Sequence, residues 1–251
     1  MAETQSLFIL NKEIGETPLE CMERFRVIQG LDPLIPMTYA GRLDPMAEGV
    51  LLVLVGEECK NKGKYLGLDK EYEVEILSGF ESDTYDILGK VKSQKEKVKS
   101  IIQNSEIERE LEKFKGKFVQ EYPAYSSKTV DGVQLHELAN KGELPETMPT
   151  KEVEIFDIEM LEEREISSEI LLKEINERIG RVKGVFRQSE ILDLWQQNLQ
   201  GLDPYRIVKI KVSCSSGTYM RSLAHNLGKN LGVPALAYSI KRTKVGKYIL
   251  N

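Results

Sequence analysis

Two charged residues stand directly before an apolar segment of this chain. Arg42 and Asp44 lie in the polar stretch YAGRLDP, and the run VLLVLV follows at 50–55. A carboxylate at such a place can act as a nucleophile or as a general base. Local rules favour a structural role, because Asp followed by Pro45 is a good N-cap and first residue for a short helix over 45–49. Arg42 could pair with this carboxylate or reach a phosphate, although an ordinary surface arginine is the default.

Arg221 is a cation at a place where helix stability disfavours one. The sequence predicts that a helix begins at about residue 220, after the turn SSGT, so Arg221 falls in the first turn. The helix dipole disfavours positive charge there, and the free amides of the preceding turn favour anions. A carboxylate or phosphate partner therefore explains Arg221 better than surface exposure, which is the alternative.

Tyr72 and Lys70 belong to the alternating segment DKEYEVEILSG at 69–79. In a regular strand, residues two apart point to the same face, so the two side chains lie side by side. An aromatic ring beside a lysine suits a nucleotide, because a base stacks on an aromatic face. The alternative for Tyr72 is simple core packing.

The wider pattern predicts an α+β fold. Apolar runs and alternation predict strands, whereas spacing at three and four residues predicts helices. Strands that mostly alternate favour a mainly antiparallel or mixed sheet flanked by helices. The expected strands are 7–10, 50–55, 69–79, 153–161 and 206–214; the expected helices are 17–25 and one from 220, with helical character over 93–117 and 162–203.

Composition excludes several classes of protein. Hydrophobic residues make up 41% and charged residues 30% of 251, and no apolar stretch is long enough to span a bilayer. Three distant cysteines and two histidines give no metal-ligand spacing, and the phosphate-binding motifs GxGxxG and P-loop are missing from the sequence. We expect a cytoplasmic protein whose chemistry uses neither a metal nor another cofactor.

Charge is distributed unevenly along the chain. The net charge is -5, yet residues 204–251 hold nine of the 35 basic residues and none of the 40 acidic ones. Such a segment could form a phosphate-binding face on an otherwise acidic body. The alternative is a solvated basic strand and helix.

Five segments in the same order resemble the TruB family of tRNA pseudouridine synthases, and they cover nearly the whole chain. The first resembles the family's GxLDPxAxGxLxxxxG motif, and the second its K-x-Y strand and TDT-x-D-x-x-G turn, with Ser82 at the first Thr. The segments are AGRLDPMAEGVLLVLVG, DKEYEVEILSGFESDTYDILG, YPAYSSKTVDGVQLHELANKG, VSCSSGTYMRSLAHNLGKNLG and IKRTKVGKY.

The resemblance implies a pseudouridine synthase fold, with the active site in a cleft across the sheet, and a reaction without cofactor. A uracil is detached from C1' of its ribose, turned over and rejoined through C5. Asp44 falls on the essential aspartate, Arg221 on the arginine that keeps it ionised and aimed, and Tyr72 on the tyrosine that stacks on the base. The further substrate- or RNA-binding residues are expected to be Lys12, Tyr39, Arg42, Lys70, Tyr125, Lys128 and Arg242.

The chain departs from the family pattern in four places, one of which is Glu13 after Lys12, where the family usually has a proline. Tyr39 stands where the family usually has a histidine that is thought to wedge into the tRNA loop. Residues 162–203 match no family segment, and we expect a helical insertion there, whose four basic residues could grip RNA: Arg178, Arg181, Lys183 and Arg187. Bacterial members commonly carry a C-terminal PUA domain, whereas we expect one catalytic domain over 1–251 without it.

The function expected from the sequence is therefore isomerisation of the T-loop uridine of tRNA, position 55, by a monomer whose partner is tRNA. Three alternatives remain: a non-catalytic RNA-binding or tRNA-folding protein of the same fold, a synthase acting on another RNA uridine, and an unrelated glycosidase. The glycosidase would need a second acid beside Asp44, and Glu48 is the only close candidate. Whether Asp44 attacks the sugar or the base, or removes a sugar proton, is open.

Overall fold

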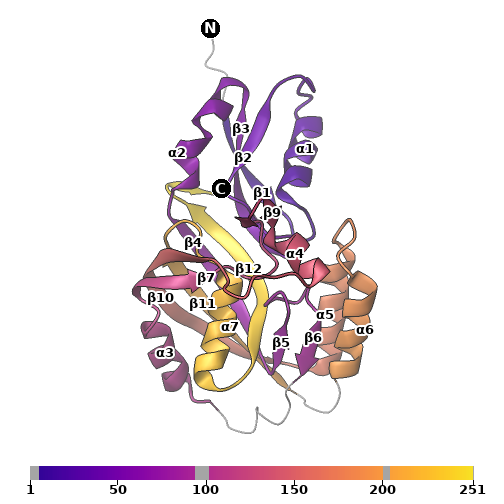
Figure 1. Ribbon diagram of the computed structural model, residues 1–251, viewed down its shortest axis with the longest axis vertical. Coiled ribbons are helices and arrows are strands. Elements are labelled where there is room, and N and C mark those ends of the chain that lie inside the picture. The colour runs from indigo at the N-terminus through magenta and orange to yellow at the C-terminus, as the bar shows by residue number, and fades with distance from the viewer. Residues whose placement is uncertain (1–5, 94–101, 200–203, 251) are drawn as a thin grey trace.

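One large mixed sheet organises the chain (Figure 1). The computed structural model describes residues 6–93, 102–199 and 204–250. The strands are β1 (Leu7–Lys12), β2 (Met37–Ala40), β3 (Ala47–Val55), β4 (Lys70–Ser78), β5 (Phe80–Ser82), β6 (Val91–Ser93), β7 (Gly116–Glu121), β8 (Thr129–Val130), β9 (Val133–Gln134), β10 (Thr150–Ile166), β11 (Tyr205–Cys214), β12 (Ala235–Val245) and β13 (Tyr248–Ile249). The helices are α1 (Pro18–Ile28), the 3-10 helix η1 (Gly56–Asn61), α2 (Lys62–Leu66), α3 (Asn104–Glu112), α4 (Leu135–Lys141), α5 (Ser168–Gly180), α6 (Gln188–Asn198) and α7 (Met220–Leu231).

The sheet joins the two ends of the described chain. Its order is β1-β3-β12-β4-β11-β10-β7, with β2 paired to β3 and β13 paired to β12. Among the described strands every pairing in this sheet is antiparallel except that of β3 with β12. Figure 1 shows β12 running through the middle of the molecule, with β3 above it and β4 and β11 on its left side. The expected mainly antiparallel α+β sheet is confirmed.

Gly49 makes the contact between β3 and β12 possible. It lies opposite Arg242 in the parallel pairing, and its φ is +105°. A Cβ at this position would lie 2.2 Å from the carbonyl oxygen of Arg242. Only glycine adopts this backbone conformation without strain and also tolerates the neighbouring strand so close.

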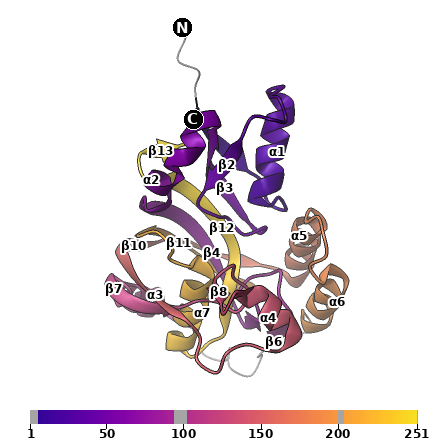
Figure 2. The same cartoon turned by 45° about the horizontal axis from the view of Figure 1, so that its top comes forward.

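Helices cover the sheet in two groups with separate apolar cores. The apolar face of α7, with Leu223 and Leu227, packs on β4, β11 and β12, as the periodicity of its sequence predicts. The helices α5 and α6 lie side by side and pack on β5 and β6, where Trp195 contacts Phe80 and donates a hydrogen bond to the carbonyl of Ile87. Figure 2 shows this pair set apart from α1 and α2, which flank β1 to β3.

Two local expectations are wrong. Residues 45–49 do not form a helix capped by Asp44: the amide of Ala47 donates to the carbonyl of Asp44 in a turn, and β3 begins at Ala47 because it pairs with β12. Residues 162–166 continue β10 against β11, and the helices begin only at Ser168, after the N-cap Ser167. Of the expected helical stretch 93–117, α3 is the described helix, and 94–101 lie outside the described residues.

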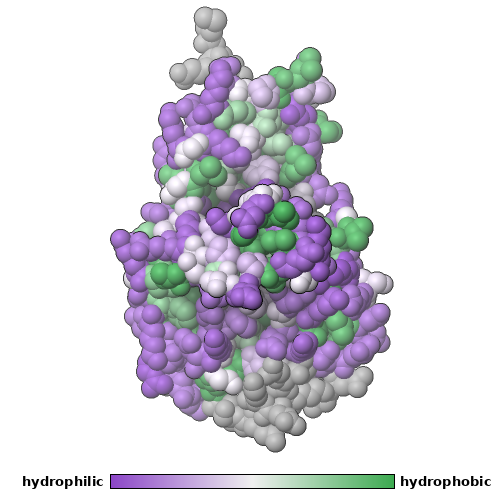
Figure 3. Space-filling view, in the orientation of Figure 1, coloured by the Kyte–Doolittle hydropathy of each residue, from purple (hydrophilic) through white to green (hydrophobic). Residues whose placement is uncertain are grey.

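Three of the nine basic residues in the C-terminal segment lie on β11 and are paired with acidic residues of neighbouring strands. Lys209 and Lys211 of β11 pair with Glu73 and Glu71 of β4, at 2.9 and 3.4 Å, and Arg206 pairs with Glu163 of β10. Opposite charges on neighbouring strands stabilise the outward face of a sheet. The charges of β11 are thus compensated locally, and Figure 3 shows a mostly hydrophilic surface with separate hydrophobic patches.

Within the described residues, the helices are too short or too polar to cross a lipid bilayer.

Replacing Gly49 with alanine tests the strand contact. We expect Gly49→Ala to lower the free energy of unfolding by about 2–6 kcal/mol, because the positive φ and the close carbonyl each cost about 1–3 kcal/mol. Urea unfolding followed by circular dichroism measures the change. Gly63→Ala is the control, because a Cβ at this position of α2 has no neighbour within 4 Å. Equal midpoints for the two variants would contradict the close approach of β3 and β12.

Candidate active site

A cleft of about 890 Å³ contains most of the residues expected to act in catalysis. It is bordered by the turn between β2 and β3, the start of β4, the start of α7, and the segments around residues 84–88 and 125–127. Segments far apart in the sequence therefore meet at one place. The expected site residues that line this cleft are Tyr39, Arg42, Asp44, Lys70, Tyr72, Tyr125, Arg221 and Arg242.

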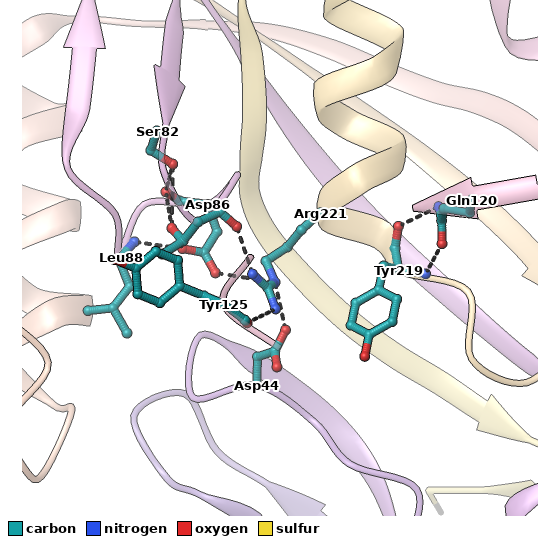
Figure 4. A network of polar contacts seen from close by, with 9 residues as sticks. Asp44, Ser82, Asp86, Leu88, Gln120, Tyr125, Tyr219 and Arg221 are labelled. Carbon is teal, nitrogen blue, oxygen red and sulfur yellow. Dashed lines mark hydrogen bonds and ion pairs between the residues drawn. The ribbon is translucent and has the colours of Figure 1, made fainter. Parts of the chain in front are cut away.

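An ion pair between Asp44 and Arg221 lies in the cleft (Figure 4). The Nε of Arg221 lies 2.7 Å from Oδ2 of Asp44, although 177 residues separate them. The other guanidinium nitrogens donate to the carbonyls of Thr84 and Tyr125, at 2.7 and 3.0 Å. The side chain of Arg221 is 3% exposed and that of Asp44 is 40% exposed. The helix dipole disfavours a cation in the first turn of α7. Arg221 nevertheless lies there, and it has a carboxylate partner, Asp44, as the sequence suggested.

Asp86 is a second carboxylate beside Arg221, and sequence reasoning missed it. Its Oδ2 lies 3.7 Å from Nε of Arg221, while Oδ1 accepts hydrogen bonds from Thr84 Oγ1 and the amide of Leu88, at 2.6 and 2.9 Å. Burial raises the pKa of Asp86, and Arg221 opposes this shift. Burial also acts to lower the pKa of Arg221, but Asp44 and Asp86 outweigh it and raise that pKa. In the sequence, the polar residues Ser82, Thr84 and Asp86 at every second position could have indicated that Asp86 belongs to the site.

Lys12 and Arg242 hold the turn that carries Asp44. Lys12 is completely buried and donates to the carbonyls of Ala47 and Glu13, at 2.5 and 2.9 Å. Arg242 donates to the carbonyls of Val50, Arg42 and Gly41, at 2.8, 3.0 and 3.3 Å. Burial lowers the pKa of Lys12 to about 8. The sequence predicts that Lys12 binds substrate or RNA, but it is not among the residues that line the cleft. Its ammonium group instead donates to backbone carbonyls of the turn, because a buried cation must find acceptors.

Tyr72 and Lys70 lie together at the start of β4, as the alternation predicts. Tyr72 is 9% exposed, and burial raises the pKa of its phenol, so the hydroxyl is protonated at neutral pH. Lys70 donates to the carbonyls of Leu66 and Leu68, and burial lowers its pKa to about 8. Its ammonium group is therefore partly engaged by the chain itself.

Tyr39 and Arg42 lie on the side of the cleft formed by the first strands. Tyr39 belongs to β2, and the ammonium group of Lys62 lies 5.3 Å from the centre of its ring. The side chain of Arg42 is exposed at the cleft, while its carbonyl accepts from Arg242. Both remain available to a substrate.

Tyr125 and Lys128 come from the segment before α4. Tyr125 lines the cleft and is tied to Arg221 through its carbonyl. Lys128 is not among the lining residues and lies over the ring of Tyr122 at 5.4 Å. The structure thus brings Tyr125 to Asp44 and leaves Lys128 outside the cleft.

Tyr219 is a further cleft residue that the sequence did not indicate. The side chain of Gln120 binds both its amide and its carbonyl, at 2.8 and 3.2 Å, just before α7 begins. Burial, with a contribution from Asp44, raises the pKa of Tyr219 to about 12. Figure 4 shows its ring directed to the same side as Asp44.

Comparison with known proteins gives the family. A sequence model of the N-terminal domain of TruB family pseudouridylate synthases matches residues 36–178. Proteins named tRNA pseudouridine synthase B are 29% identical over 97% of this chain and 70% of theirs in Borrelia garinii subsp. bavariensis, and 30% identical over the same shares in Borreliella burgdorferi. That of Clostridium tetani is 31% identical over 90% of this chain and 63% of its own length.

Solved structures agree on the fold. The crystal structure of a Cbf5-Nop10-Gar1 complex matches 98% of this chain with a TM-score of 0.61 at 20% identity. An H/ACA RNP bound to a substrate RNA containing 2'-deoxyuridine matches with a TM-score of 0.57 at 19% identity. The chain spans about half the length of these structural relatives.

The sequence and the fold are therefore those of the pseudouridine synthase class. Within that class, the chain belongs to the TruB family of pseudouridylate synthases.

Arg221→Lys tests the contacts that the guanidinium of Arg221 makes with Asp44, Thr84 and Tyr125. An ammonium group cannot serve Asp44, Thr84 and Tyr125 at once with the geometry of a planar guanidinium. We expect the single-turnover rate of pseudouridine formation to fall by about 100-fold or more, as a small displacement of a reacting group can cause. Arg24→Lys is the matched control, since Arg24 pairs with Glu16 at an exposed place. A wild-type rate for Arg221→Lys would rule out this role.

Arg242→Lys tests the support of the Asp44 turn. Lysine cannot reach Gly41, Arg42 and Val50 together, and each buried carbonyl left without a donor costs about 1–3 kcal/mol. We expect a loss of about 2–4 kcal/mol in the free energy of unfolding, by the same reasoning, together with a lower rate at saturating RNA. Urea unfolding and single-turnover kinetics measure both. Lys241→Met, at the exposed neighbour on β12, should change neither.

Proposed function

We propose that this protein converts the uridine at position 55, in the T-loop of tRNA, to pseudouridine, and that Asp44 starts the reaction. Family membership supports the class of reaction, and the names of the relatives support tRNA as the substrate. The observation that carries the assignment to Asp44 is its ion pair with Arg221 in a cleft that also contains Tyr72.

The reaction needs no net oxidant, reductant or second substrate. Uridine and pseudouridine have the same atoms: the bond from C1' to N1 breaks, a bond from C1' to C5 forms, and a proton leaves C5 while N1 gains one. One carboxylate can begin this sequence by attacking the sugar or the base, or by removing a sugar proton. Arg221 binds Oδ2 of Asp44, and within the described residues Oδ1 has no hydrogen-bond donor, which leaves that oxygen for the substrate.

The cleft suits a base that has left its stack. Extruding a nucleotide costs a few kcal/mol, which contacts with the RNA must offset. The ring of Tyr72 offers a stacking surface, and its protonated phenol is also close enough to Asp44 for that charge to affect its pKa. Arg42 adds an exposed positive charge for a phosphate.

We also propose that the chain acts as one catalytic domain, as a monomer and in the cytoplasm. Its first and last described strands belong to one sheet, which supports a single domain. The helices α5 and α6 belong to the same domain, because their apolar residues share a core with β5 and β6.

Mapping pseudouridine in an unmodified tRNA transcript tests this function. We expect product at position 55 with the wild-type protein and at least a 1,000-fold slower reaction, on the order of the loss of a nucleophile or base, with Asp44→Ala. Glu48→Gln is the control: it removes the neighbouring carboxylate, which does not line the cleft, and should react normally.

Each other result has a definite meaning. Product only at another uridine would overturn the assignment of position 55. A normal rate with Asp44→Ala would overturn the role of Asp44. Faster tRNA folding without any pseudouridine would favour the non-catalytic RNA-binding protein.

A further inference from the structure

The loop between α5 and α6, residues 181–187, forms an additional wall of the cleft. We call it the hairpin loop. Its last three residues, Val185, Phe186 and Arg187, all line the cleft, and Val185 is 98% exposed. This loop lies beyond residue 178, where the match to the family model ends. Figures 1 and 2 both show α5 and α6 side by side, as one projecting pair.

The hairpin loop is fixed in place and is shaped in advance of binding. The Oε1 of Gln188 accepts from the amide of Phe186 at 2.8 Å, and its Nε2 donates to the carbonyl of Gly184 at 2.7 Å. On its other side, Arg181 packs so close to Gly15 that a Cβ on Gly15 would lie 2.6 Å from that of Arg181. A surface ordered in this way loses little conformational freedom when it binds a ligand.

Arg187 links the hairpin loop to Tyr125 of the cleft. Its Nη1 donates to Oδ2 of Asp83 at 2.7 Å and to the hydroxyl of Tyr125 at 2.9 Å. Its guanidinium also lies 4.6 Å from the centre of the Tyr125 ring. Arg221 holds the carbonyl of the same tyrosine, so the two arginines fix Tyr125 at both its ring and its backbone.

We propose that the hairpin loop is part of the RNA-binding surface. In this proposal, Phe186 offers an aromatic face to an unpaired nucleotide next to the extruded uridine, and Arg187 is a positioning residue that holds Tyr125. A nucleotide whose neighbour has left the stack gains from a replacement stacking partner, and unpaired bases in RNA stack on aromatic side chains. Val185 and Phe186 present apolar surface at the cleft beside Arg187, and contact with a base would remove that surface from water. The proposal rests on the proposed function for its ligand.

Two of the four basic residues that were expected to grip RNA make contacts within the protein. Arg187 is committed to Asp83 and Tyr125, and Arg178 donates to the carbonyl of Tyr238 at 2.9 Å. Changing all four to glutamate would disturb folding together with RNA binding. Single changes at the hairpin loop separate the two effects.

The first test uses two replacements of Phe186 in the full chain. Phe186 also packs against the core of α5 and α6, so Phe186→Leu keeps apolar contact and removes only the aromatic face. We expect Phe186→Leu to bind an unmodified tRNA transcript about tenfold more weakly, with an unchanged single-turnover rate at saturation, because stacking accounts for such a factor. Phe186→Trp, which keeps an aromatic face, should bind the transcript as tightly as the wild type. Ile170→Ala, at a half-exposed apolar residue of α5 that does not line the cleft, is the matched control.

Tryptophan fluorescence adds a direct signal. The sequence has one tryptophan, Trp195, and it is buried. A base that stacks on the new indole of Phe186→Trp should quench its fluorescence on titration with tRNA, whereas the wild-type protein should show little change. Equal affinity of Phe186→Leu and wild type would overturn the RNA contact, as would unquenched fluorescence of Phe186→Trp at saturation.

The second test concerns Arg187. Arg187→Lys retains the charge but loses the planar guanidinium that lies over the Tyr125 ring and contacts both carboxylate oxygens of Asp83. We expect a roughly tenfold slower single-turnover rate with tRNA affinity changed less than twofold, which is the signature of lost positioning. Weaker binding at an unchanged rate would instead make Arg187 a phosphate contact and overturn the positioning role.

The results separate this inference from the proposed function. A wild type that binds tRNA through Phe186 but forms no pseudouridine at position 55 would overturn the function and support the RNA contact. Normal modification of position 55 together with normal affinity of Phe186→Leu would overturn the contact alone. A wild type that binds no tRNA would overturn both.

Discussion

The guanidinium of Arg221 is the group on which the cleft depends. A buried cation is costly unless charged and polar partners surround it, and removing one partner leaves the rest uncompensated. The partners of Arg221 come from three separate segments: the turn of Asp44, the turn of Thr84 and Asp86, and the segment of Tyr125. These segments converge because no single one of them can satisfy the cation.

A second group of cations keeps the cleft positive. Lys12 and Arg242 are buried beside the Asp44 turn, yet within the described residues their hydrogen bonds go to backbone carbonyls and not to carboxylates. Carbonyl dipoles satisfy hydrogen bonds without cancelling the net charge. The turn is therefore held rigidly while its carboxylate is left for Arg221 and the substrate, and the surroundings still attract a polyanion.

Sequence reasoning found the residues that meet in the cleft, but not how the others support them. Asp44, Tyr72 and Arg221 were indicated by a motif, an alternation and an unfavourable helix position, all of which are local signals. The direction of Lys12 depends on the antiparallel pairing of β1 with β3, and that of Arg242 on the parallel pairing of β3 with β12, which no local pattern encodes. The same pairing overrode the capping preference of Asp44 and Pro45, and pairing with β11 made 162–166 a strand despite their charge.

The parallel pairing of β3 with β12 also has a consequence for synthesis of the protein. Asp44 is translated early, but its turn lacks Arg221 and Arg242 until the ribosome has released almost 200 further residues. Contacts of such long sequence separation close slowly. A nascent chain that ends before α7 lacks both arginines, and one that ends between α7 and β12 has the ion-pair partner of Asp44 but not the support of its turn by Arg242. The turn of Asp44 is therefore complete only when the last strands of the sheet have been made.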